Sequence, residues 1–481
     1  MSAKPTFHNR NTGYTYRPRT RRDIPRDVAY RALRRVETEG AYANLLLPEA
    51  ITAAKLKRRD AAFVTELVYG TLRLRGRYDA IISLVSSRPL AEIDPEVLTI
   101  LRLGAHQILG MRVEDYAAVD STVGIARDRI SRGPANLVNA VLRRIAAHPL
   151  AYWLDQIAQG LSPERAYAAV YSYPEWIVWA LKDALVAAGR SADDLPALLA
   201  AQNRGAYVTL CARPGLIDAD TLATAAEEFL DTSTRLGELC DTAVVLEHGD
   251  PRRLRAVQRG LAGVQDEGSQ LVAQVLAAVS LTGTERTWVD LCAGPGGKTA
   301  LLAGLAPEGV SVVANEIAPH RAELVRQTTK VYGERVTVMT GDGREFAVRY
   351  AGKADRVLVD APCSGLGSLR RRPEARWNHE PGDLKTLIPL QKELLNSAVA
   401  TARVGGVVAY ATCTPHLGET CQVLAAILAQ HPELEVVDAP DVARRILVDS
   451  THDLGSGPYL QLWPDRDDTD AMFLAILRKT A

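Results

Sequence analysis

The sequence predicts three folded domains: an all-α bundle, a small α/β connector and a C-terminal Rossmann-like α/β domain. The chain has 481 residues, which is enough for about two to four domains with cores of their own. Apolar residues recur at helical spacing through residues 26–150, and no β-like alternation interrupts them. After residue 261, short apolar runs alternate with helical segments, a pattern typical of a doubly wound parallel sheet.

Residues 1–25 are expected to form a disordered basic arm. The first 26 residues contain seven Lys and Arg side chains against the single acid Asp23, and almost no aliphatic residues. Such a segment has too little apolar surface to offset the entropy of ordering it. Its charge suits contact with nucleic acid, but a solvated tail without a partner fits the composition equally well.

Residues 26–150 are predicted to form the bundle. In the first helix Val28, Leu33 and Val36 share one face, and Gly40 is a natural stop. Further apolar-striped segments cover residues 61–74, 95–109, 117–125 and 135–147. Arginines cluster at the edges of these segments, which indicates either an RNA-binding surface or ordinary solvated helix faces.

Residues 151–260 are predicted to be a mixed connector. Helical patterns cover residues 176–187, 197–201 and 220–230, and short strand patterns cover residues 207–211 and 243–246. This combination predicts a small α/β unit between the two larger domains.

Residues 261–481 are predicted to contain a mostly parallel sheet. Strand candidates are residues 287–291, 310–314, 336–339, 356–359, 406–411 and 472–477, with helical segments at 299–306, 319–332 and 384–403. In such sheets, ligands bind beyond the carboxyl ends of the strands. Polar or reactive residues follow five strands in succession: Asp290, Asn315-Glu316, Asp342, Asp360 to Cys363, and Thr412-Cys413. We therefore expect a functional site at this edge.

The stretch "VDLCAGPGGKT" (289–299) contains Gly-Lys-Thr, as a phosphate-binding loop does. A Walker loop needs a glycine five positions earlier, where this chain has Cys292. Glu316 follows Asp290 by 26 residues, at the end of the second strand, where an acid can accept hydrogen bonds from ribose hydroxyls. With Asp342 placed for adenine and glycines that let a compact amino-acid tail approach, the pattern predicts S-adenosylmethionine. A tight turn without a ligand is the alternative.

Cys363 and Cys413 follow neighbouring predicted strands, so we expect them to face each other across the ligand, with Asp360 beside them. A thiolate is a strong nucleophile, and a nearby carboxyl can give or take a proton. Such a set suits addition to carbon 6 of a pyrimidine, after which carbon 5 can attack a sulfonium methyl group. The alternative is that both are small buried apolar residues. That role is expected for three further cysteines, Cys211, Cys240 and Cys421.

No disulfide framework or metal site is predicted, because the six cysteines show no CxxC spacing. No apolar run reaches the roughly 18 residues that span a bilayer, and the N-terminus lacks the apolar core of a signal peptide. We therefore expect a cytoplasmic protein without membrane contact, and nothing in the sequence calls for more than a monomer.

Four motifs in order resemble one known family. They are "QDEGSQL" (265–271), "DLCAGPGGKT" (290–299), "DAPCSGLGSLRRRPEARW" (360–377) and "YATCT" (410–414). The chain thereby resembles the RNA cytosine-5 methyltransferases of the RsmB (Sun/Fmu) type. "RDAAFVTELVYGTLR" (59–73) and "PANLVNAVLRRI" (134–145) are similar to the NusB-like RNA-binding domain of that branch. The resemblance implies a connector with a role in RNA binding, S-adenosylmethionine as cofactor and 16S ribosomal RNA as partner.

The resemblance also implies roles for individual residues. Cys413 would be the nucleophile that adds to carbon 6, and Cys363 would assist release of the methylated RNA. Asp360 would hydrogen-bond the cytosine and help to protonate its ring. The S-adenosylmethionine pocket would be lined by Cys292, Ala293, Gly294, Pro295, Gly296, Gly297, Lys298, Glu316, Asp342 and Asp360.

After Cys413 the chain departs from the family pattern. Many members have a Pro-Glu-Glu-Asn-Glu run there, whereas this chain reads Leu417-Gly418-Glu419-Thr420-Cys421. The resemblance therefore assigns no role to the acids of that run. A role for Glu419 is left open.

Arg370, Arg371, Arg372 and Arg376 lie beside Trp377, and we expect these arginines to bind RNA. Arginines with an aromatic side chain can hold phosphates and stack on unpaired bases. A target cytosine has to leave its stack to meet a thiolate, so the expected substrate is single-stranded or loop RNA. A core position is the alternative for Trp377.

The resulting hypothesis is an enzyme that methylates carbon 5 of a cytosine in 16S ribosomal RNA, free or in a pre-ribosomal particle. A transfer-RNA methyltransferase with the same site is the alternative within the class. The paired thiols disfavour a non-catalytic RNA-binding or antitermination module. The missing Walker glycine disfavours a nucleotide hydrolase.

Overall fold

The computed structural model describes residues 23–481. Of the basic arm expected at residues 1–25, residues 1–22 lie outside the described range. Within that range, the structure has no helix that is both long and apolar enough to cross a membrane.

The N-terminal helices begin and end where the sequence provides caps. The Asp23 carboxylate accepts a hydrogen bond from the backbone N–H of Arg26 at 3.1 Å, Pro25 lies in the first turn, and Gly40 ends the helix with φ of 63°. The helices of the bundle are α1 (Ile24–Glu39), α2 (Ala43–Ala53), α3 (Arg58–Arg73), α4 (Arg75–Val85), α5 (Pro95–Leu109), α6 (Asp115–Arg129), α7 (Arg132–Ile145) and α8 (Leu150–Ala158).

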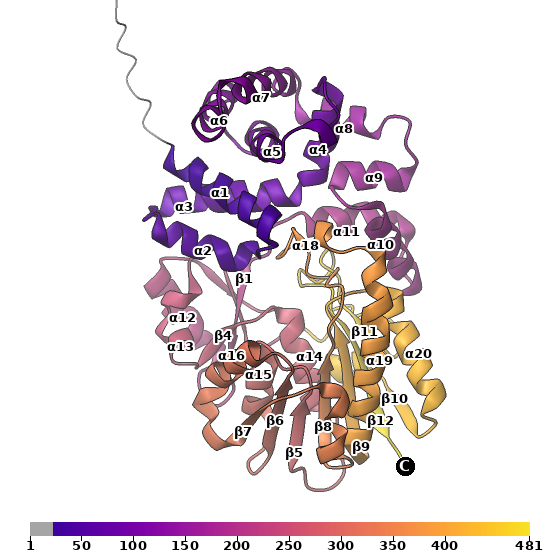
Figure 1. Ribbon diagram of the computed structural model, residues 1–481. Coiled ribbons are helices and arrows are strands. Elements are labelled where there is room, and N and C mark those ends of the chain that lie inside the picture. Colours follow the sequence, from indigo (N-terminus) through magenta and orange to yellow (C-terminus); the bar gives the residue numbers. More distant parts are fainter. Residues whose placement is uncertain (1–22) are drawn as a thin grey trace, which may run out of the picture.

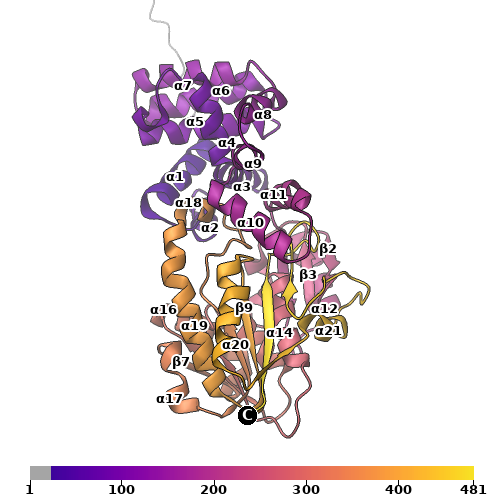
Figure 2. The ribbon, with the colours of Figure 1, turned by 90° about the vertical axis from the view of Figure 1, so that its right-hand side faces the viewer.

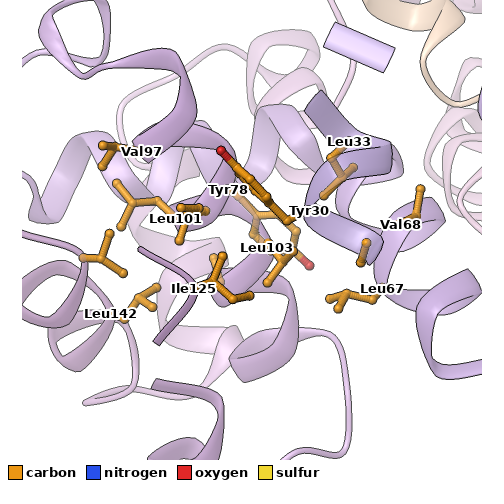
Figure 3. Packing of buried hydrophobic residues seen from close by; sticks show 14 of the residues in the cluster. Tyr30, Leu33, Leu67, Val68, Tyr78, Val97, Leu101, Leu103, Ile125 and Leu142 are labelled. Carbon is orange, nitrogen blue, oxygen red and sulfur yellow. The ribbon is translucent and has the colours of Figure 1, made fainter. Parts of the chain in front are cut away.

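The apolar stripes of these helices meet in one core (Figure 3). Leu33, Leu67 and Leu142 are at most 1% exposed there, and burial of each such side chain contributes about 1.5–3 kcal/mol. Helix α8 belongs to the same core, because Trp153 is buried in it and its indole donates to the carbonyl of Ile145 at 3.0 Å. The bundle therefore extends past the boundary expected at residue 150.

The connector consists of three helices and a small antiparallel sheet. The helices are α9 (Pro163–Tyr171), α10 (Glu175–Ala187) and α11 (Leu195–Gln202). The sheet has the order β2-β3-β1-β4, with strands β1 (Val208–Ala212), β2 (Thr234–Leu236), β3 (Ala243–Leu246) and β4 (Ala262–Val264), accompanied by α12 (Ala219–Leu230) and α13 (Arg255–Gln258). Because β4 pairs with β1, the connector sheet reaches residue 264, beyond the boundary expected at 261.

The C-terminal domain is built on one large sheet of order β10-β12-β9-β8-β5-β6-β7, with β11 beside β12. Strands β5 to β9 are mutually parallel, as predicted, and β10 to β12 add antiparallel partners. The strands are β5 (Thr287–Asp290), β6 (Ser311–Glu316), β7 (Val336–Thr340), β8 (Ala354–Asp360), β9 (Ala402–Thr412), β10 (Leu434–Val437), β11 (Leu460–Gln461) and β12 (Phe473–Lys479).

Helices cover both faces of this sheet (Figures 1 and 2). Successive side chains of β8 alternate: Leu358 packs in the core beneath α14, α15 and α21, whereas Val357 and Val359 pack beneath α19 and α20. The helices are α14 (Glu267–Ala278), α15 (Gly297–Leu305), α16 (Pro319–Thr329), α17 (Ala347–Tyr350), α18 (Ala375–Asn378), α19 (Leu384–Thr401), α20 (Cys421–Gln430) and α21 (Ala439–Arg444).

The predicted fold class is thereby confirmed: an all-α bundle, an α/β connector and a doubly wound C-terminal domain. The chain that leaves the carboxyl end of β8 runs toward the bundle and forms α18, which lies between the sheet and the bundle (Figure 1). The carboxyl ends of the parallel strands therefore face the helical domain.

Candidate active site

A tight loop joins β5 to α15 at the edge of the sheet. Gly296 has φ of 107°, and a Cβ there would lie 3.0 Å from the backbone of Val325 in α16. Asp290, at the end of β5, is 1% exposed and accepts a hydrogen bond from the Thr299 hydroxyl at 2.6 Å. Burial raises the pKa of Asp290 to about 7. The turn is thus held by its own residues.

Glu316 joins this loop to the end of β6. One carboxylate oxygen accepts the backbone N–H of Gly294 at 3.0 Å, and the other accepts that of Ala318 at 3.0 Å. A Cβ at Gly294 would lie only 2.3 Å from the Glu316 carboxylate, so a larger residue there would displace that side chain. Glu316 is 3% exposed. The acid expected at a ribose therefore lies directly against the glycine loop.

Asp342 follows β7 at the same edge. Its carboxylate accepts the backbone N–H of Arg344 at 2.9 Å and forms an ion pair with that guanidinium at 2.6 Å. The Arg344 side chain holds the pKa of Asp342 below its ordinary value. Glu316 and Asp342 thus provide carboxylates at two adjacent strand ends, a set that fits the ribose hydroxyls and adenine amino group of S-adenosylmethionine.

Lys298 distinguishes the loop from a triphosphate site. Its ammonium group donates to the Asp360 carboxylate at 2.7 Å, and burial, which opposes the charge, is outweighed by Asp360, so the pKa of Lys298 lies above its ordinary value. In a Walker loop the corresponding lysine is directed at phosphates. Here a carboxylate from β8 occupies that place.

Cys363 and Cys413 are brought together as predicted. They follow the paired strands β8 and β9, and their sulfur atoms are 3.4 Å apart. Either sulfur can be the donor in this contact. The hydrogen bond with Cys363 lowers the pKa of Cys413, with the Lys298 ammonium acting in the same direction. The same contact, together with burial, raises the pKa of Cys363. Cys413 is therefore the more readily ionised of the two.

Glu419 supports the backbone beside Cys363 and was left open by the sequence. It is fully buried, accepts the backbone N–H of Ser364 at 2.8 Å and also accepts the Ser364 hydroxyl. The Gln391 amide donates to it at 3.0 Å. Ser364 and Glu419 are 55 positions apart in the chain, and no sequence signal links them.

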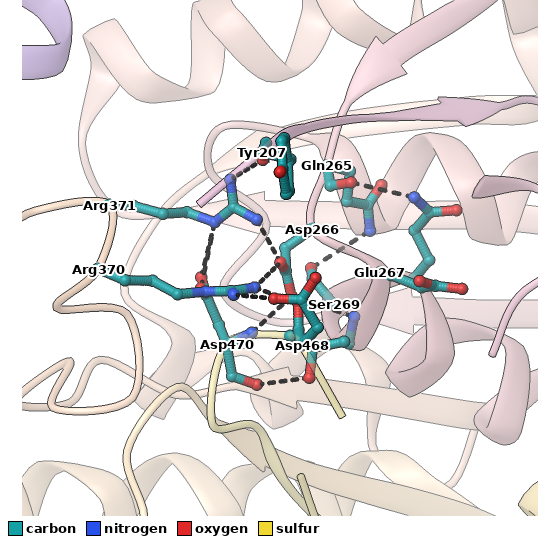
Figure 4. A network of polar contacts seen from close by, with 12 residues as sticks. Tyr207, Gln265, Asp266, Glu267, Ser269, Arg370, Arg371, Asp468 and Asp470 are labelled. Atoms are coloured by element: carbon teal, nitrogen blue, oxygen red, sulfur yellow. Dashed lines mark hydrogen bonds and ion pairs between the residues drawn. The ribbon is translucent and has the colours of Figure 1, made fainter. Parts of the chain in front are cut away.

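Arg370 and Arg371, expected to bind RNA, are instead held by acids of the same chain (Figure 4). Arg370 is 5% exposed and donates to Asp470 at 3.0 Å and to Asp468 at 2.9 Å. Arg371 forms ion pairs with Asp266 and Asp470. These contacts join the loop after β8 to the residues before α14 and β12, so the expected RNA role is replaced by a structural one.

Arg376 is likewise unavailable to RNA, because it is 0% exposed and bonded within the protein. Arg372 differs: it is exposed, and its guanidinium lies 5.7 Å from the ring centre of Tyr42. Among these four arginines, an RNA contact therefore remains proposed only for Arg372. Trp377 is half-buried where α18 meets the bundle, next to Gly76. It is therefore neither a fully exposed ring for stacking nor a residue of the deep core.

Comparison with known proteins assigns the chain to a family. Residues 277–478 match the family model described as 16S rRNA methyltransferase RsmB/F, and residues 23–147 match the NusB family. The Pseudomonas putida ribosomal RNA small subunit methyltransferase B is 31% identical, over 86% of this chain and 91% of that protein. The chain belongs to the RsmB/F methyltransferase family. The Mycobacterium tuberculosis protein Rv1407 is 45% identical over 95% of this chain and 97% of its own length.

The fold of this RsmB/F protein is similar to that of solved structures. The crystal structure of PH0851 matches with a TM-score of 0.77 at 22% identity, covering 95% of this chain and 99% of that one. The resemblance and the cofactor expected from the sequence are confirmed: this RsmB/F protein is an S-adenosylmethionine-dependent RNA methyltransferase.

Proposed function

We propose that this protein transfers the methyl group of S-adenosylmethionine to carbon 5 of a cytosine in 16S ribosomal RNA, through a covalent cysteine adduct at carbon 6. The observation that carries the proposal is the thiol pair, with sulfur atoms 3.4 Å apart beside the Lys298–Asp360 ion pair. The ribosomal substrate is supported by the description of the family model and by the name of the Pseudomonas putida relative.

In this mechanism Cys413 is the nucleophile, because its pKa is lowered by the hydrogen bond with Cys363 and by Lys298. Its sulfur bonds to carbon 6, and the electron pair of the ring double bond moves to carbon 5. Asp360 hydrogen-bonds the ring, passes to ring nitrogen 3 a proton taken from the Lys298 ammonium as the thiolate adds, and takes that proton back when the ring double bond re-forms. S-adenosylmethionine supplies the methyl group. The carbon 5 centre then carries both a methyl group and a hydrogen.

Cys363 completes the reaction. While Cys413 is a thiolate, its hydrogen bond and charge raise the pKa of Cys363 and keep that thiol protonated. Once the Cys413 sulfur is bonded to carbon, both influences end, and Cys363 can ionise. It then takes the proton from carbon 5, the ring double bond re-forms, and the bond between carbon 6 and the Cys413 sulfur breaks.

The Lys298→Met variant should lose activity mainly at low pH. Without the ammonium group, and with Asp360 left uncompensated, the pKa of Cys413 rises, so the acid limb of the pH–rate profile moves to higher pH. At a pH below the pKa of Cys413, a rise of about 1 in that pKa lowers the thiolate fraction about tenfold. The measurement is kcat against pH at saturating cofactor. The matched control is Lys353→Met, which lies just before the amino end of β8, away from the thiols. Equal pH–rate profiles for the two variants would contradict the role of Lys298 in lowering the pKa of Cys413.

The function is tested with tritiated S-adenosylmethionine and RNA from a strain that lacks the gene. Naked 16S ribosomal RNA, small ribosomal subunits and transfer RNA are offered in parallel, and labelled nucleosides are separated after digestion. We expect label in 5-methylcytosine of the ribosomal substrates. Label in another nucleoside would reject the carbon 5 chemistry, and label in transfer RNA alone would reject the ribosomal substrate.

A further inference from the structure

The chain directly after Cys363 connects the thiol pair to the helical bundle. We call residues 364–378 the strut. It begins beside the catalytic cysteines, passes the ion pairs of Figure 4, and ends in α18 against the bundle and the connector helices (Figure 1).

The lower end of the strut is fixed to both cysteines. Ser364 is held by Glu419, and the backbone N–H of Gly367 donates to the carbonyl of Cys413 at 2.9 Å. The carbonyl of Gly367 in turn accepts the N–H of Ala471 at 3.0 Å. A Cβ at Gly367 would lie 2.3 Å from the Ala471 carbonyl oxygen, so this contact is possible only for glycine.

The upper end is fixed by Arg376, which lies where three helices end. Its guanidinium donates to the carbonyls of Arg73 at 3.0 Å, Ser172 at 3.3 Å and Gln202 at 3.0 Å, and to the Asn203 side chain at 2.7 Å. These residues are at the carboxyl ends of α3, α9 and α11. Burial, together with the nearby Arg73 and Arg77, lowers the pKa of Arg376 to about 10. Helix carboxyl ends leave carbonyls unpaired and carry partial negative charge, so they offset part of the cost of burying this cation.

Residues on either side of Arg376 reinforce the contact. The Glu374 carboxylate accepts the N–H of Ala43 at 3.2 Å, at the amino end of α2, where the helix dipole favours an acid. The indole of Trp377 covers Gly76 of α4, where a Cβ would lie 2.5 Å from the ring. Arg376 itself stacks at 3.9 Å on the ring centre of Tyr173. The docking surface thus combines matched helix ends with close packing.

We propose that Arg376 is a positioning residue that fixes the NusB-like bundle relative to the thiol pair, and thereby determines which cytosine of a folded RNA reaches Cys413. The inference rests on the proposed function. An RNA held by the bundle at one point can present only those bases that lie at the fixed distance set by the strut. Weakening the contacts between the strut and the bundle changes the effective concentration of the target base at the thiols. The thiols themselves are not altered.

The test compares wild type with Arg376→Met and Gly76→Ala. The first variant removes the guanidinium. The second is a change in the bundle that displaces Trp377 and leaves every buried charge in place. Each enzyme is assayed on full-length 16S ribosomal RNA and on a short single-stranded oligonucleotide that carries the target cytosine. Methylated positions are mapped by bisulfite sequencing. Leu101→Ala, in the bundle core away from the strut, controls for general loss of stability.

We expect both variants to raise KM for the long RNA at least tenfold and to spread methylation to neighbouring cytosines. Their kcat/KM on the oligonucleotide should stay within twofold of wild type, and Leu101→Ala should keep the wild-type position. Unchanged KM and position on the long RNA, or an equal loss on both substrates, would overturn the inference. A wild-type enzyme that forms no 5-methylcytosine would instead overturn the proposed function.

Discussion

Cys413→Ala should abolish methyl transfer to RNA while leaving cofactor binding intact. Without the sulfur no adduct forms at carbon 6, so carbon 5 stays a poor nucleophile, and kcat should fall by about 10³-fold or more, as expected when a covalent nucleophile is removed. The measurement is incorporation of tritiated methyl groups under single-turnover conditions, with cofactor affinity measured by calorimetry.

The matched control is Cys421→Ala, which removes a half-buried thiol at the start of α20. This variant should retain wild-type kcat. If Cys413→Ala methylated RNA as fast as Cys421→Ala, the nucleophile would have to be another group, and the mechanism would be rebuilt around Cys363.

Cys363→Ala should trap the enzyme on its RNA. The variant keeps the Cys413 nucleophile but lacks the base that removes the carbon 5 proton, so the methylated adduct accumulates. It should appear as a protein–RNA band that survives denaturing electrophoresis and contains tritium from the cofactor. In wild type the contact with Cys363 lowers the pKa of Cys413, and the variant lacks this contact. The pKa of Cys413 is therefore higher in the variant, and the adduct should form faster as the pH rises and more of Cys413 becomes thiolate.

The double variant Cys363→Ala/Cys413→Ala is the control, since it offers no thiol for the bond and should give no band. Normal turnover by Cys363→Ala without an adduct would remove Cys363 from the release step. A band that persists in the double variant would place the covalent bond on a different residue.

The sequence was informative wherever a property is local. Strand and helix periodicity located β5 to β9, and parallel strands bring their carboxyl ends to one edge, so Asp290, Glu316, Asp360 and Cys413 could be placed together in advance. The pairing of Cys363 with Cys413 followed from the same argument. Which thiol ionises first depends on Lys298 and on hydrogen-bond direction, and neither is visible in spacing.

Properties that depend on distant partners were not predictable. A run of arginines looks the same whether it meets phosphates or carboxylates. Arg370 meets Asp470, which lies 100 residues further along the chain, and Arg371 meets Asp266, 105 residues earlier. The limits of the domains are a property of the same kind, because Trp153 and β4 join units that only tertiary packing defines.

The position of Arg376 also constrains the order in which the protein is made. Its contact with the Arg73 carbonyl spans 303 residues, so the bundle leaves the ribosome long before the side chain that docks on it. At typical synthesis rates the interval is roughly 15–60 s. During that time the carboxyl ends of α3, α9 and α11 lack the guanidinium of Arg376. The finished arrangement of RNA-binding and catalytic domains is therefore set late in synthesis, only after the segment that follows Cys363 has emerged.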